Sequence, residues 1–485
     1  MLNLVKKYKG YALYVYTMLL LAINSIRIFS DSIWGDEAFS IRLVRRGTEY
    51  ILYKTAKDVH PPLYYLILEF FSKIFEPSAM IGKFVSFLPI VFVCIVAVTY
   101  IKKKFGAGVA MIIVGVVTFT GNCVPMIVEV RMYTWALFFA FMNMVCINEL
   151  LSAQEEKGKK RFWIGHCVWS LFAAYTHYYA LILIAFMDAT LYIMLFIKNK
   201  KVWKKCLLSM TAMILAYLPW LRILLEQFKS TSNSFWIQDI DIKSSILYLF
   251  GQDRWGKILL LVFLFSILCF YFTKEGFDIK HSKIGKKNQA VVDWEWKFSC
   301  SSDEQKLILL NMIATFGTIF VGIAVSWLIR PMYLERYIFP AIGLVAFSLG
   351  IAYRKCFKNI FFLLLLLVVM TFSGKTQFMD VYQKELTYLT EETKNYMQEN
   401  MLEGDIILAD DDSFSWTVLE YYFPQTESFH CNNWKIDEEG QNRVWLMKSK
   451  DETALSVYEA AGYRVEEKAN LGLDRVFFKL YLLEK

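Results

Sequence analysis

The chain has 485 residues, of which 56% are hydrophobic and 17% aromatic, and its mean hydropathy is +0.37. This composition excludes an ordinary soluble protein and predicts an integral membrane protein. The formal net charge of +8 is unevenly distributed, because acidic residues outnumber basic ones by 22 to 11 between positions 380 and 485. We therefore expect a membrane domain at residues 1–375 and a second domain at residues 376–485. The basic residues lie in short clusters between apolar spans, so nucleic acid is not expected as a partner.

Apolar stretches of about 20 residues predict transmembrane helices. Eleven are expected, near residues 11–29, 80–101, 106–126, 132–151, 162–176, 179–197, 206–224, 256–273, 306–329, 337–353 and 359–373. The first lacks a small-residue cleavage site and is interpreted as a signal anchor. Lysine-rich clusters alternate along the chain with loops that carry acidic, histidine and tyrosine residues. The positive-inside rule then predicts a cytoplasmic N-terminus, with those loops and the C-terminus on the outer face.

The first outer loop, residues 30–78, contains Asp36-Glu37 and the sequence His60-Pro61-Pro62. Carboxylates at a membrane face are costly to desolvate, so the acidic pair indicates a functional site. The alternative is that Asp36 only caps a helix from Ala38 onward. The apolar segment 62–75 is too short for a span and predicts a juxtamembrane or partly embedded helix.

The polar residues of the outer face could together form one active site. They are Asp36, Glu37, His60, Glu129, Arg131, Tyr133, His177, Tyr178, Arg336 and Tyr337. Asp36 can act as a base, while Arg131 and Arg336 carry planar guanidinium donors that suit a phosphate. Alternatively, these arginines only anchor the protein among lipid headgroups, and Arg330 could be an ordinary span end. An ion pathway would instead need carboxylates near mid-membrane, where the spans are nearly all apolar.

Five motifs occur in order between residues 9 and 353 and carry a resemblance to a known family. They are Trp34-Gly35-Asp36-Glu37-Ala38, His60-Pro61-Pro62-Leu63-Tyr64-Tyr65, Glu129-Val130-Arg131-Met132-Tyr133, Tyr175-Thr176-His177-Tyr178 and Glu335-Arg336-Tyr337. As a set they resemble the dolichyl-phosphate-mannose-protein mannosyltransferase-like family (glycosyltransferase family 39), to which the lipid A aminoarabinose transferase is related. The chain departs from many relatives by having Gly35 directly before Asp36. It also lacks the repeat domains of the eukaryotic members, so protein O-mannosylation is not implied.

The resemblance implies a polytopic helical enzyme of the bacterial plasma membrane with the GT-C fold. It implies that Asp36, with Glu37 beside it, catalyses transfer of a sugar from a polyprenyl-phosphate-linked donor with inversion. The implied acceptor is a hydroxyl of a glycan, lipid or protein outside the cell. The remaining outer-face residues named above are expected to bind the substrates.

Two alternatives stay open at the level of the sequence. No metal-binding motif is evident, but Asp36, Glu37, His60 and Glu129 could hold a divalent ion, which would permit a metal-assisted variant. A transporter or flippase of lipid-linked glycans would perform no covalent chemistry. That class predicts polar residues within the spans and an internal repeat, and neither is found in the sequence.

The acidic tail is predicted to be a small α/β domain. Its strands are expected at residues 405–409, 443–447 and 475–480, and its helices at residues 415–423 and 453–461.

Overall fold

The computed structural model describes most of the chain. The described residues are 2–152, 159–230, 241–274, 279–284, 287–292, 296–298, 300–329, 331–356, 359–387, 389–411, 415–434, 442–451, 454–474 and 476–485.

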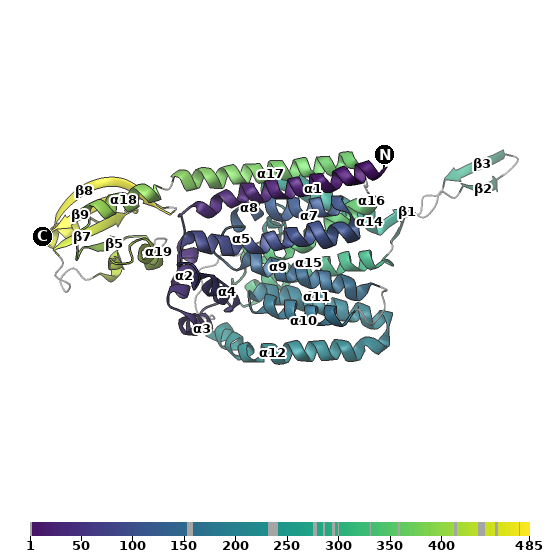
Figure 1. Cartoon of the computed structure of the whole chain (residues 1–485), viewed down its shortest axis with the longest axis horizontal. Coiled ribbons are helices and arrows are strands. Elements are labelled where there is room, and N and C mark those ends of the chain that lie inside the picture. Colours follow the sequence, from purple (N-terminus) through teal and green to yellow (C-terminus); the bar gives the residue numbers. More distant parts are fainter. Residues whose placement is uncertain are drawn as a thin grey trace.

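A bundle of long apolar helices forms the body of the molecule (Figure 1). Its members are α1 (Leu2–Ser25), α5 (Ala79–Val96), α7 (Ala107–Phe119), α9 (Tyr133–Leu151), α10 (Lys160–Ala174), α11 (Tyr178–Lys198), α12 (Trp203–Ser230), α14 (Arg254–Tyr271), α15 (Asp303–Leu328), α16 (Ile342–Cys356) and α17 (Ile360–Thr387). Within the described residues, nine helical segments are long and apolar enough to cross a membrane. They match nine of the eleven expected spans. The other two expected spans are the shorter helices α7 and α10, so the count of eleven is not confirmed.

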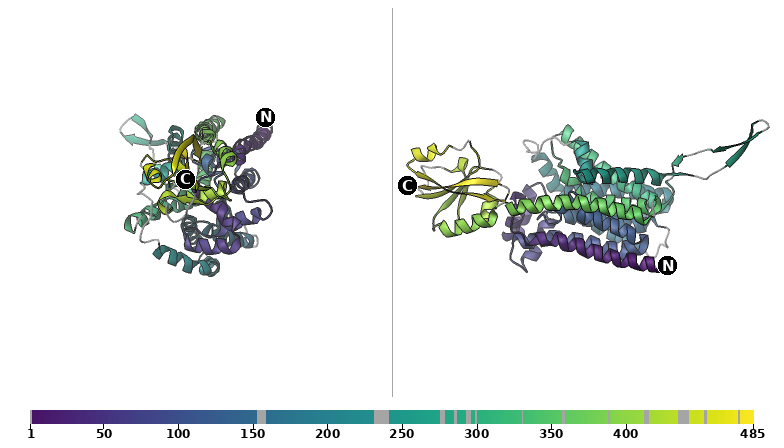
Figure 2. Two further views of the ribbon diagram at one scale, coloured as in Figure 1. Left: turned by 90° about the vertical axis from the view of Figure 1, so that its left-hand side faces the viewer. Right: turned by 90° about the horizontal axis from the view of Figure 1, so that it is seen from above.

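Ion pairs between basic and acidic side chains lie at one end of the bundle. At the end away from the tail, Lys104 pairs with Glu149, Lys198 lies 3.6 Å from Asp303, and Arg354 lies 2.9 Å from Glu304. The N-terminus and the hairpin of β2 (Ile279–Ile284) and β3 (Lys287–Val292) lie at this same end (Figures 1 and 2). Short strands β1 (Phe272–Lys274) and β4 (Trp296–Phe298) join the hairpin to the bundle. The side of the membrane that each end faces stays a prediction.

A polar network joins three helices in the middle of the bundle, where the sequence had suggested almost entirely apolar positions. His166 Nδ1 lies 2.7 Å from Asn143 Oδ1, and Asn143 donates to Asp188 Oδ1 over 3.2 Å. Ser170 donates to the other Asp188 oxygen, and His166 Nε2 lies 3.1 Å from the Tyr192 hydroxyl. Each of these side chains has a protein partner, as buried polar groups require. The network therefore holds α9, α10 and α11 together rather than lining a path.

The predicted first outer loop folds into short helices at the opposite end of the bundle. They are α2 (Gly35–Arg45), α3 (Thr48–Lys57) and α4 (Leu63–Ser72), and η1 (Ile26–Phe29) comes directly before the loop. Gly47 precedes α3 with a φ of 82°, a backbone conformation that favours glycine. Pro62 precedes α4, where the missing proline amide costs no helical hydrogen bond. With ten residues, α4 is too short to span a membrane, as predicted for this segment.

Short elements beside the long helices complete this end of the bundle. They are α8 (Cys123–Met126), α13 (Ile242–Tyr248) and η5 (Glu335–Ala341). Helix α17 runs on to Thr387, through the expected domain boundary near residue 375, and leads directly into the tail.

The tail is an α/β domain, as predicted. It contains α18 (Thr390–Asn400), β5 (Ile406–Ala409), α19 (Ser415–Tyr422), β6 (Ser428–His430), β7 (Arg443–Lys448), α20 (Ser456–Ala460), β8 (Arg464–Leu473) and β9 (Val476–Glu484). The sheet order is β6-β5-β7-β9-β8, with β5 parallel to β6 and β7, and β9 antiparallel to β7 and β8. The strand β8 was not predicted, because charged residues such as Glu466 and Glu467 interrupt its apolar pattern.

Candidate functional site

The acidic pair lies in the first turn of α2, where the helix dipole favours negative charge. The N-cap is Trp34, so the alternative that Asp36 caps this helix is wrong. The buried Glu37 carboxylate accepts from the Trp34 amide over 3.1 Å and from the Val130 amide over 2.8 Å. Glu37 thereby ties the start of α2 to the segment before α9.

The Asp36 carboxylate lies against two arginines that come from distant parts of the chain. Its Oδ2 lies 3.1 Å from Nη2 of Arg336 on η5 and 3.9 Å from Nε of Arg131. The Arg131 Nη1 also donates to the Asp36 carbonyl and to the Tyr65 hydroxyl, each over 3.3 Å. The Asp36 side chain remains 34% exposed, whereas Arg131 is buried. One carboxylate that is open to a substrate thus faces two fixed guanidinium groups.

Aromatic rings enclose the Arg336 guanidinium. It lies 5.3 Å from the centre of the Trp34 ring and 5.9 Å from that of Tyr133, within the range of cation–π attraction. Among the described residues, the buried Arg336 Nε and the Tyr133 hydroxyl have no hydrogen-bond partner. Buried donors of this kind are normally paired, so their freedom at this site indicates room for ligand oxygens.

Two histidines stack beside the arginines. The rings of His60 and His177 are 5.6 Å apart, and Tyr133 and Tyr337 pack on His177 at 5.6 and 5.0 Å. Burial, together with Arg131 and Arg336, lowers the pKa of His177 to about 3. Burial likewise holds the pKa of His60 well below its usual value. Both rings are therefore neutral at physiological pH.

The tautomer of His177 follows from its hydrogen bond. Its Nδ1 accepts from the Tyr179 amide over 3.2 Å, so the neutral ring carries its proton on Nε2. This Nε2 is buried and has no partner among the described residues. His177 consequently offers a donor for a ligand.

An apolar cavity of ≈ 230 Å³ opens next to the histidines. Its lining combines His60, His177 and Tyr337 with aliphatic and aromatic side chains of α11, α12 and α15, such as Leu181 and Phe228. The hydroxyl of Tyr178, which also lines it, bonds to Gln227 and accepts from Trp220 over 3.1 Å. This cavity suits a hydrocarbon chain whose polar end points toward the arginines.

A second, more polar cavity of ≈ 610 Å³ lies between the bundle and the tail. Trp34, Glu129 and Arg336 line it from the bundle, Asp380 from α17 and Asp474 from the tail. Because Arg336 lines this cavity and Tyr337 lines the apolar one, consecutive residues of η5 border the two cavities.

Three further residues of the site were missed from the sequence. Tyr65 contacts Arg131, and Lys83 lies buried beneath the loop that leads to Asp36. Burial raises the pKa of Asp58, although the Val59 amide and Arg131 oppose this shift. Asp58 lies only two residues before His60. Its closeness to the rigid His-Pro-Pro sequence could have marked it as a site residue. Arg330 lies outside the described residues.

The four residues that could have held a divalent ion are not gathered into a metal-binding group. Within the described ranges, no three His, Cys, Asp or Glu side chains converge as such a group. The physical reason is that the Asp36 carboxylate is turned to Arg336 and the Glu37 carboxylate to two backbone amides.

Two solved structures resemble the fold of this chain over almost its whole length. The apo structure of ArnT from Cupriavidus metallidurans matches with a TM-score of 0.62 and 10% sequence identity, over 98% of each chain. The chain has the fold of ArnT. The structure of ArnT bound to undecaprenyl phosphate matches with a TM-score of 0.61 over 97% of each chain, also at 10% identity. The predicted fold class is therefore confirmed. No protein-family model and no curated protein sequence matches the chain.

Proposed function

We propose that this protein transfers a sugar from a polyprenyl-phosphate-linked donor to an acceptor hydroxyl at the outer face of the membrane. The observation that carries the proposal is the Asp36 carboxylate, held against Arg131 and Arg336. Arg336 lines the polar cavity, and the next residue, Tyr337, lines the apolar one. The binding of undecaprenyl phosphate by ArnT, a protein of the same fold, supports a donor of this class.

The lipid chain of the sugar donor binds in the apolar cavity, and its phosphate lies against the hydrogen-bond donors next to this cavity. Arg131 and Arg336 present charged N–H groups to the phosphate oxygens, and His177 adds a neutral Nε2–H. These donors are fixed by burial and aromatic packing before the substrate arrives, so they stabilise the leaving phosphate without reorganisation.

Transfer occurs as a single displacement with inversion. The acceptor oxygen attacks the anomeric carbon and gives its proton to Asp36 as the general base. The bond from the anomeric carbon to the phosphate oxygen breaks, and its electron pair leaves with the lipid phosphate. The two arginines stabilise the negative charge on the departing lipid phosphate. The phosphate oxygen therefore needs no proton from an acid catalyst.

The remaining residues position these groups. Glu37 has both carboxylate oxygens engaged by backbone amides, so its role is to hold α2 rather than to exchange protons. His60, Tyr133 and Tyr337 pack around His177 and exclude water from the phosphate. Glu129 lines the polar cavity, where the sugar and the acceptor bind, and Tyr178 shapes the apolar one.

A direct assay tests the proposal. The purified protein is reconstituted in proteoliposomes and incubated with a set of undecaprenyl-phosphate sugars that carry the label in the sugar. A cell-envelope extract supplies the acceptor. We expect label to leave the lipid fraction and to appear in the acceptor fraction. Retention of label on every lipid, with movement of labelled lipid between leaflets, would instead identify a transporter. Mass comparison of lipid extracts from cells with and without the protein would name the sugar.

A further inference from the structure

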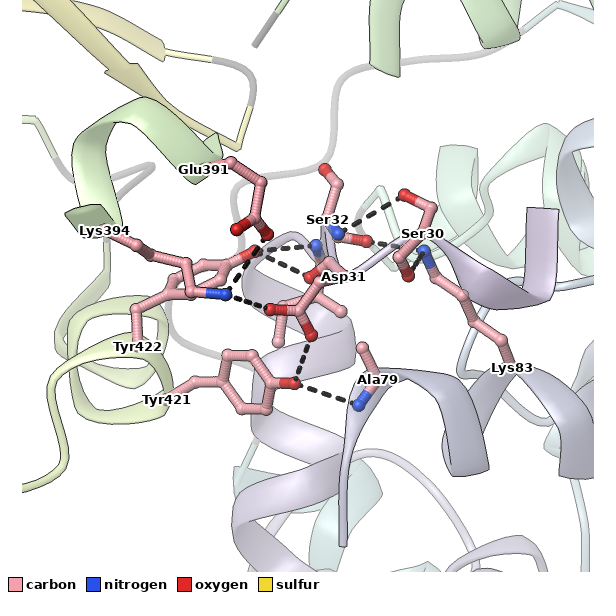
Figure 3. Close-up of polar contacts among 10 residues, drawn as sticks. Ser30, Asp31, Ser32, Ala79, Lys83, Glu391, Lys394, Tyr421 and Tyr422 are labelled. Carbon is pink, nitrogen blue, oxygen red and sulfur yellow. Dashed lines mark hydrogen bonds and ion pairs between the residues drawn. The ribbon is translucent and has the colours of Figure 1, made fainter. Parts of the chain in front are cut away.

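The segment 30–34, which leads from η1 into α2, has no regular secondary structure. Its backbone groups are nevertheless bonded from two sides, by the bundle and by the tail (Figure 3). Asp36 follows this segment by two residues, so whatever holds the segment also determines the position of the proposed base.

From the bundle, the buried Lys83 of α5 holds the segment. Its Nζ donates to the carbonyl of Ser30 over 2.8 Å and to that of Ser32 over 2.7 Å. A lysine is rarely this buried unless its ammonium is fully used. These bonds hold the segment to the first turns of α5.

From the tail, two tyrosines hold the segment. The Tyr422 hydroxyl donates to the Asp31 carbonyl and accepts from the Ile33 amide, both over 3.0 Å. The Tyr421 hydroxyl lies 3.2 Å from Asp31 Oδ1 and accepts from the Ala79 amide at the start of α5 over 2.9 Å.

A lysine of the tail adds an ion pair. Lys394 Nζ, on α18, lies 2.7 Å from Asp31 Oδ2. We call Lys394, Tyr421 and Tyr422 the tail clamp (Figure 3).

Helix α19, which carries Tyr421 and Tyr422, also packs against α2. Glu420 pairs with Arg42 Nε at 3.0 Å and with Arg46 Nη2 at 3.1 Å. The Arg45 guanidinium lies 4.9 Å from the centre of the Tyr421 ring. The tail therefore contacts both the approach to α2 and its last turn, while Asp36 lies between these contacts.

We propose that the tail domain positions the catalytic carboxylate, with Tyr422, Tyr421 and Lys394 as positioning residues that act through Asp36. This inference rests on the proposed function. The bundle supplies Arg131 and Arg336, so the Asp36-to-arginine geometry depends on how firmly the tail and Lys83 hold the loop between them. A displacement of about 1 Å at a reacting group can cost on the order of 100-fold in rate.

Tyr422→Phe tests the proposal with a minimal change, because it removes only the hydroxyl that bonds to Asp31 and Ile33. In the full-length protein, we expect kcat for release of sugar from labelled undecaprenyl-phosphate sugar to fall about 10- to 100-fold. The KM for the donor should stay within about 3-fold, because the donor contacts lie on the bundle. Hydrogen exchange at residues 33–38 should become faster. In an Asp36→Asn background, Tyr422→Phe should have no further effect on kcat, since coupled residues are non-additive.

Tyr481→Phe is the matched control. It removes a hydroxyl of the same domain that bonds to Glu467 at 3.0 Å on the sheet, away from the clamp, and should change neither kcat nor exchange at residues 33–38. If Tyr422→Phe does not fold, Lys394→Met at the partly exposed ion pair replaces it, with the same expectations.

The outcomes separate the two proposals. Unchanged exchange in the clamp variants would overturn the clamp whether or not the parent is active. Faster exchange with unchanged kcat would overturn its positioning role. A parent that releases sugar from no donor would overturn the proposed function instead, and the exchange experiment would still decide whether the tail holds the loop.

Discussion

Asp36→Asn is the substitution that bears most directly on the proposed chemistry. The change keeps the size of the side chain and leaves one oxygen that can accept from Arg336, which lies 3.1 Å from Asp36 Oδ2. The new amide group can turn to solvent, because the Asp36 side chain is 34% exposed. Folding and donor binding should therefore persist. The proton acceptor is lost, and a positioned base contributes on the order of 10²–10⁴-fold in rate.

The assay measures release of labelled sugar from undecaprenyl-phosphate sugars in proteoliposomes, alongside binding of undecaprenyl phosphate and the unfolding temperature. Glu49→Gln on α3 removes an exposed carboxylate from the same loop, residues 30–78, and should leave all three unchanged. Glu37→Gln should lower the unfolding temperature together with the rate, because an amide group would face one of the two backbone donors. A folded Asp36→Asn variant with full transfer activity would refute the assignment of Asp36 as the base.

Three further outcomes follow from the site and the topology. Arg336→Lys or Arg131→Lys keeps the charge but loses the planar fork, so binding of undecaprenyl phosphate should weaken about ten-fold or more, and unchanged binding would make these arginines mere anchors. The pKa of His177 is about 3 in the fold and about 6.5 unfolded, so the unfolded chain takes up the proton first and stability should fall as pH drops below about 6.5. With His177→Gln, the unfolding temperature should fall less steeply as the pH is lowered, and the buried His60 accounts for part of the slope that remains. In intact cells, a cysteine at Asp451 should react with an impermeant thiol reagent and one at Lys103 should not, whereas the reverse would invert the topology.

The native Cys431 is a poor reporter for that labelling experiment. It lies partly buried in the tail, and burial raises the pKa of its thiol to about 11, which leaves little reactive thiolate. Asp451 is exposed and avoids this difficulty.

The sequence by itself determined the features that depend on local composition. Apolar length marked nine of the membrane helices, and the brevity of segment 62–75 marked α4 as a helix too short to span a membrane. Clustered lysines marked one end of the bundle, and the motifs marked the other. These signals are local, because hydrophobic length and charge act on each segment before any tertiary contact forms.

The tertiary structure decided how residues far apart in the chain meet. Asp36 and Arg336 are 300 positions apart, and the ion pair between them exists only because the fold brings the first turn of η5 to the first turn of α2. Only the fold brings the loop carbonyls of Ser30 and Ser32 to the ammonium of Lys83 on α5. The contact of Tyr422 with Asp31 spans 391 positions and leaves no periodicity to detect. Hydrophobic pattern determines which segments are buried, but the hydrogen bonds that position a catalytic group depend on directions in space, which only the packed chain sets.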